Sequence, residues 1–137
     1  MYREAEVQAL VEGAAAKGAT YLDDHEPGWL FKVDVAQLDL SSSFFCILGQ
    51  AFGEYDEGLD VICPIGVSQP NAFFQPGSEE ISRTRTDWSS EHGFTLPKGV
   101  DQILNGQNRA EANDAWRLLD EAWIYEIKTR LDAGVTI

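Results

Sequence analysis

The stretch expected to decide the fold is residues 38–59, which read LDLSSSFFCILGQAFGEYDEGL. Three serines at 41–43 come directly before an apolar run, and serine hydroxyls often cap the free N–H groups at the start of a helix. The run over residues 43–52 is apolar on nearly every side, which is typical of a helix enclosed by other elements. We therefore expect residues 43–52 to form the central core helix, shielded from water.

A first helix is expected upstream of this segment. Residues 3–24 repeat apolar side chains at helical spacing, and the turn pair Pro27–Gly28 ends the helix. Gly13 and Gly18 lie inside it. They either weaken the helix, by roughly 1 kcal/mol each relative to alanine, or let another helix approach closely.

Further helices are expected downstream. A short one should run from about Glu54 until Pro64 stops it, and another should cover residues 79–92. Residues 29–40 alternate poorly and fit either a short helix or an extended segment. A long final helix is indicated by apolar residues that recur every three or four positions: Ala112, Trp116, Leu119, Trp123, Ile127 and Leu131.

A long loop interrupts these helices. Residues 64–77 read PIGVSQPNAFFQPG, in which prolines and glycines surround Phe73 and Phe74. Adjacent aromatics in a long loop either pack over the core or form a contact surface. The sequence thus predicts a mainly α protein, a compact single-domain bundle of about five helices over residues 1–137 with a Pro/Gly-rich central loop.

Charge is the least ordinary feature of the composition. Ten Lys and Arg face 23 Asp and Glu, which gives a formal net charge of −13, and neither Lys nor Arg occurs between Lys32 and Arg83. Such a surface repels phosphate backbones, so direct nucleic-acid binding is not expected. It attracts basic protein surfaces. The alternative is that the charge only keeps the protein soluble.

The compartment is predicted from the lack of targeting signals. No apolar run reaches the roughly 18 to 20 residues of a membrane span, and the N-terminus, MYREAEVQALVEG, carries acids where a signal peptide carries bases. We therefore expect a cytoplasmic protein that does not enter a membrane. Cys46 and Cys63 lie in or beside apolar runs and are expected to be reduced.

Metal-binding residue types are present without metal-binding spacing. Four residues match a tetrahedral zinc set in number: His25, Cys46, Cys63 and His92. None of them lies within the short Cys–Cys or His–His spacings of zinc sites. The acids around Gly58 do not follow the calcium-loop pattern. No metal and no cofactor is expected.

Catalytic motifs are not found, and Cys46 lies among bulky apolar residues where a thiol is inert. These observations disfavour an enzyme, and no catalytic residue is assigned. His25 sits between two acids that favour its protonated form. One alternative is therefore a small-molecule-binding protein or hydrolase with a pocket formed by His25, Glu26, Trp29 and Gln50.

Four segments carry a resemblance to a group of proteins: LDDHEPGW (22–29), LDLSS (38–42), CILGQAFG (46–53) and EHGF (91–94). They resemble small acidic proteins encoded by actinobacterial phages, prophages and their hosts. The likeness is best over residues 20–60, and this chain differs at Phe44 and in its longer, proline-rich middle. The resemblance implies a cytoplasmic, phage-type viral protein that acts on a host component, and it attaches no catalytic or ligand role to any residue.

The favoured hypothesis is an interaction protein that binds a basic host protein. The residues expected to make this contact are Glu54, Asp56, Glu57, Asp60, Phe73 and Phe74. Mimicry of DNA by the carboxylates is a variant of the same hypothesis. The Trp-bearing final helix could equally line a two-fold interface, so a homodimer stays open.

Overall fold

The computed structural model describes residues 4–64, 78–104 and 109–133, with 78–83 and 101–102 given by their backbone only. Within these ranges every regular element is helical, which confirms the mainly α prediction. The elements are α1 (Glu4–His25), η1 (Trp29–Lys32), η2 (Val35–Gln37), α2 (Ile47–Phe52), α3 (Tyr55–Ile62), α4 (Ser78–Glu91), α5 (Lys98–Leu104) and α6 (Arg109–Asp132). Phe73 and Phe74 lie outside the described residues.

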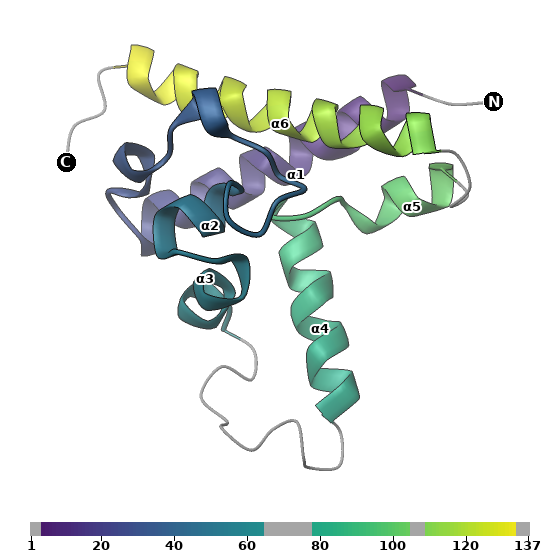
Figure 1. Ribbon diagram of the computed structural model, residues 1–137, viewed down its shortest axis with the longest axis horizontal. Coiled ribbons are helices and arrows are strands. Elements are labelled where there is room, and N and C mark those ends of the chain that lie inside the picture. The colour runs from purple at the N-terminus through teal and green to yellow at the C-terminus, as the bar shows by residue number, and fades with distance from the viewer. Residues whose placement is uncertain (1–3, 65–77, 105–108, 134–137) are drawn as a thin grey trace.

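The two longest helices, α1 and α6, lie side by side and form the frame of the molecule (Figure 1). They run in the same direction: Arg117 of α6 pairs with Glu4 at the start of α1, and Arg130 pairs with Asp23 near its end. The short helices α2 and α3 pack below this pair, while α4 projects away from it (Figure 1). Both long helices were predicted because each keeps an apolar stripe over many turns.

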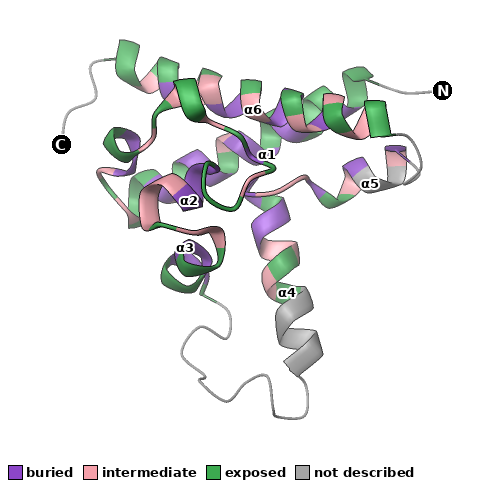
Figure 2. Cartoon of the chain, viewed as in Figure 1, coloured by how far each residue is buried: buried purple, intermediate pink, exposed green. Residues whose placement is uncertain are grey.

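The core lies where these elements meet, and buried residues line their facing sides (Figure 2). Trp123 of α6 is fully buried at its centre, and its indole Nε1 donates to the carbonyl oxygen of Gly93 at 2.6 Å. The rings of Trp29 and Phe94 pack on it with centroid distances of 5.9 and 5.6 Å. Trp123 belongs to the same buried cluster as Val7, Val11 and Leu22 of α1.

The central helix is shorter than predicted. Residues 43–52 were expected to be helical, but α2 begins only at Ile47. The cap is the Cys46 sulfur, which accepts the Gly49 N–H at 3.2 Å, and not one of the serines. Ser42 Oγ instead accepts the N–H groups of Phe44 and Phe45, so the chain turns before the helix starts.

This turn also changes what is buried. Ile47 and Leu48 are fully enclosed as expected, but Phe44 and Phe45 keep 61% and 47% of their surface exposed. The expectation that the whole apolar run avoids water is therefore wrong for its first residues. Gly49 explains part of this, because a Cβ there would lie 2.6 Å from the backbone of Phe44, which crosses directly over α2.

The remaining elements agree with the sequence in kind, apart from α5. Residues 29–40 form two short 3-10 turns, η1 and η2, and the Asp34 side chain caps the second. Helix α3 follows Glu54 and ends before Pro64, as expected. Helix α5 was not predicted, because seven residues after Pro97 give too little periodicity.

Two further expectations concern the environment of the chain. Cys46 and Cys63 are both buried and neither forms a disulfide, as expected for reduced thiols. Among the described helices, none is both long and apolar enough to cross a membrane.

Candidate functional site

An acidic surface lies at the start of α3. Asp56 and Glu57 occupy its first turn and are exposed, and the half-buried Glu54 precedes them at the N-cap position without a side-chain capping bond. Carboxylates at this position are favoured by the partial positive charge of a helix N-terminus. Asp60, one turn further on, accepts a bond from Arg85 at 2.6 Å, so a cation of α4 already neutralises it.

The turn that carries Phe44 is hydrogen-bonded to the start of α3. The backbone N–H of Tyr55, the first residue of α3, donates to the carbonyl oxygen of Ser43 at 2.8 Å. Phe44, which is exposed, follows Ser43 directly, and the acids flank Tyr55, so this bond joins the two segments that carry them. Sequence reasoning missed Phe44 because an apolar run predicts burial. The available signal was Ser42, whose hydroxyl favours a turn over a helix.

A small hollow opens next to this turn. It has a volume of about 150 Å³ and is lined by Leu40, Ser41, Ser42, Ser43, Tyr55, Phe94, Thr95 and Trp116. The Tyr55 hydroxyl lies 2.5 Å from Ser89 Oγ, and burial raises the pKa of its phenol. Ligand pockets usually enclose roughly 300 to 1,000 Å³, so this hollow is small for a substrate.

The alternative pocket residues Trp29 and Gln50 have structural partners. Trp29 is buried, and its Nε1 donates to Asp23 Oδ1 at 3.0 Å. The Gln50 amide accepts from the N–H of Asp34 at 2.6 Å and donates to the carbonyls of Asp34 and Phe45. These bonds hold the turns between α1 and α2 together.

His25 and Glu26 lie at the end of α1. His25 is exposed, its ring stacks on Tyr21 with centroids 4.0 Å apart, and its Nδ1 lies 3.0 Å from the Tyr21 carbonyl oxygen. Glu26 receives the Trp29 N–H on its carbonyl oxygen at 3.1 Å, in the turn that follows. Both residues therefore help to end the helix.

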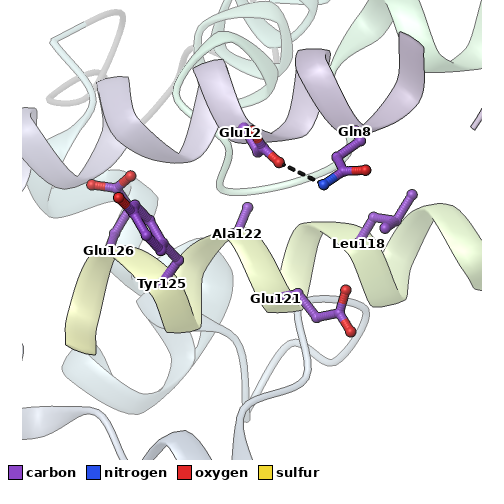
Figure 3. Close-up of a pocket in the computed structure, with 7 residues that line it drawn as sticks. All are labelled: Gln8, Glu12, Leu118, Glu121, Ala122, Tyr125 and Glu126. Carbon is purple, nitrogen blue, oxygen red and sulfur yellow. Dashed lines mark hydrogen bonds between the residues drawn. The ribbon is translucent and has the colours of Figure 1, made fainter. Parts of the chain in front are cut away.

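A groove of about 500 Å³ lies along the seam between α1 and α6 (Figure 3). Gln8 and Glu12 of α1 form one wall. The other wall belongs to α6 and consists of Leu118, Glu121, Ala122, Tyr125 and Glu126. Sequence reasoning did not predict this groove, because a periodic stripe indicates which side of a helix is buried but not where two helices part.

Burial shifts the pKa of Cys46 and His92, which are buried, and of Asp120, which is half-buried. Burial raises the pKa of the Cys46 thiol and lowers the pKa of His92. Burial also raises the pKa of Asp120 to about 6, although its Oδ1 accepts the Leu40 N–H at 2.7 Å. In the part of the chain that the structure describes, no three His, Cys, Asp or Glu side chains gather closely enough to hold a metal ion.

Comparison of this chain with known protein families, with curated proteins and with solved structures gives no match.

Proposed function

We propose that this protein acts by binding a basic surface on another protein through the acidic surface at the start of α3. The contact residues are Phe44, Glu54, Asp56 and Glu57. The observation that carries the proposal is the backbone bond between Tyr55 and Ser43, which ties the turn that bears the exposed Phe44 to the helix start that bears the exposed Asp56 and Glu57. Because the resemblance implies a phage-type protein, the expected partner is a basic protein of the host cytoplasm.

The two kinds of side chain have different roles in such a contact. The carboxylates act at long range, attracting a basic partner and raising its rate of association at low salt. Phe44 acts at short range, because exposed aromatic rings that fill a partner's pocket often provide a large share of the binding energy. Asp60 is expected to contribute less than the other acids, since Arg85 already pairs with it.

Affinity purification from host extract with the full chain tests this proposal. It is run at about 50 mM and about 500 mM salt, where charge attraction is strong and screened respectively. We expect a basic partner that is retained at low salt and is lost with the double variant Asp56→Lys/Glu57→Lys. The matched control is Asp24→Lys/Asp132→Lys, which reverses two exposed acids on α1 and α6.

Phe44→Ser separates the aromatic contact from charge. We expect this variant to weaken binding of the purified partner at both salt concentrations by about tenfold or more. Equal capture by the α3 variant and its matched control would overturn the proposal, and so would an unchanged affinity of Phe44→Ser. Circular dichroism of each variant verifies that the helices are intact.

A further inference from the structure

The groove between α1 and α6 has the form of a helix-binding site. On α6 its residues Leu118, Glu121, Ala122 and Tyr125 follow the spacing i, i+3, i+4 and i+7, which is the stripe that one helix presents to another. Figure 3 shows these side chains along α6, with Gln8 and Glu12 of α1 opposite. Leu118 and Ala122 of this stripe are buried in the core, while Glu121 and Tyr125 are exposed and can meet another segment.

The floor and the end of the groove are apolar. Leu118 and Ala122 are buried at the seam between the two helices, while Tyr125 keeps 66% of its surface exposed. A tyrosine exposed to this degree beside an apolar floor offers a large amphipathic contact, the kind that is enriched at protein interfaces.

The walls of the groove are acidic. Glu12 lies on α1 and Glu121 on α6, so an occupant meets a carboxylate on either side. Arg117 bonds Glu121 at 3.0 Å, but it is shared with Glu4 and Asp114, and three carboxylates outweigh one guanidinium. The end of the groove near Arg117 therefore keeps a negative charge.

From this complementarity we propose that the groove binds an amphipathic, basic helical segment of a partner protein. The apolar side of the segment packs against the exposed ring of Tyr125, at the seam where Leu118 and Ala122 are buried. Its Lys or Arg side chains reach Glu12 and Glu121. A second copy of this chain fits less well, because each copy has a formal net charge of −13 and the acidic walls would repel each other.

This groove is separate from the acidic surface at the start of α3. Asp120 accepts the Leu40 N–H from the segment that leads to Phe44, so that segment lies on the Asp120 side of α6. Ala122 is two residues further along, about 200° around the helix axis. The two surfaces therefore lie on roughly opposite sides of α6, and the inference does not depend on the proposed function.

A designed peptide tests the inference. The probe is a fluorescent peptide of about 14 residues with leucines at helical spacing on one side and lysines elsewhere. Its control has the same composition in an order that gives no apolar side. By fluorescence anisotropy at about 150 mM salt, we expect the amphipathic peptide to bind at least about tenfold more tightly than its control.

Variants of the full chain assign the binding to the groove. We expect Tyr125→Ala to lower the affinity for the amphipathic peptide by about tenfold. Glu12→Gln keeps an acceptor for the Gln8 side chain but removes one negative charge. This variant should lower the affinity for the peptide by about threefold. The matched control Asp132→Asn, outside the groove, should change affinity less than about twofold.

Three results would overturn the inference. They are equal affinity for both peptides, an unchanged affinity of Tyr125→Ala, and peptide-induced shifts in NMR spectra that map to α3 instead of α1 and α6. Sedimentation of the protein alone gives a fourth test. A dimer that Tyr125→Ala dissociates would assign the groove to a second copy of this chain and would overturn the inference. Asp56→Lys/Glu57→Lys should leave peptide binding within about twofold, so this test can fail independently of the one for α3.

Discussion

Gly18 of α1 lies directly against the backbone of His92. A Cβ at Gly18 would overlap the His92 carbonyl oxygen and would lie 2.9 Å from Cζ2 of Trp123. The absent side chain is what lets α1 approach both the end of α4 and the central tryptophan of α6. Gly13, in the same helix, differs, because a Cβ there would meet nothing within 4 Å.

Substitution of the two glycines by alanine should therefore change the free energy of unfolding in opposite directions. Gly13→Ala is expected to raise the free energy of unfolding by about 0.5 to 1 kcal/mol, because alanine is the better helix former and open space surrounds it. Gly18→Ala is expected to lower it by about 2 kcal/mol or more, because neither backbone nor indole can move away easily. Urea denaturation of both variants measures this, and a shift in the same direction for both would contradict the packing described.

Asp120 should destabilise the protein at neutral pH. Burial raises the pKa of its carboxyl from 3.8 to about 6 in the folded state. Between these values the folded state binds more protons than the unfolded state, so this contribution to stability falls as pH rises from about 4 to about 6. Asp120→Asn still accepts from Leu40 and should be more stable at pH 7.5 by about 1 kcal/mol, a figure reduced because the carboxyl is partly exposed.

The same variant provides its own control at low pH. Near pH 3.5 Asp120 is protonated in the folded state and mostly protonated in the unfolded state, so the difference in unfolding free energy between Asp120→Asn and the parent should shrink toward zero. A difference that stays constant between pH 3.5 and 7.5 would show that the carboxyl does not titrate as described.

The titration of His92 should lower the stability of the protein as the pH falls, which is the opposite of the effect of Asp120. Burial lowers the pKa of its imidazole, with Lys17 also lowering it and Glu91 opposing, while Nδ1 lies 2.7 Å from the Trp88 carbonyl oxygen. Below about pH 6.5 the unfolded state gains a proton that the folded state resists, so stability is lost as the solution is acidified. The neutral ring is the form that the core accepts.

His92→Phe tests this in the Asp120→Asn background, which removes the competing titration. Phenylalanine retains an aromatic ring to stack on Trp88, where the imidazole centroid lies 4.2 Å away. We expect the variant to lose less stability than its parent between pH 7.5 and 5, as measured by thermal or urea denaturation. Parallel pH curves for the two proteins would show that another group is responsible.

Cys46 should serve as a helix cap and not as a reactive thiol. It is 1% exposed, its sulfur accepts the Gly49 N–H, and burial raises the pKa of the thiol. Alkylation by iodoacetamide at pH 8 is therefore expected to be slow in the folded protein and complete in denaturant. Cys46→Ala should cost about 1 kcal/mol through the lost cap, and Cys46→Ser, which keeps an acceptor, should cost less. Rapid alkylation of the folded protein would contradict this arrangement.

The sequence by itself determined the helices that keep one apolar stripe. Helices α1 and α6 were predicted to within a few residues because periodicity is a local property, written in the chain without reference to its neighbours. The start of α3 was also predictable, since Glu54 and the acids after it suit a helix N-terminus. The net charge and its concentration between Lys32 and Arg83 are likewise properties of the chain alone.

Only the tertiary structure decided which apolar and small residues face solvent and which face the core. A run that is apolar on all sides has no period, so nothing in the order of residues separates exposed Phe44 from buried Ile47. Gly13 and Gly18 are identical in sequence terms and differ only in what lies against them. The groove between α1 and α6 arises in the same way, because a helix pattern describes one surface and a groove exists only between two.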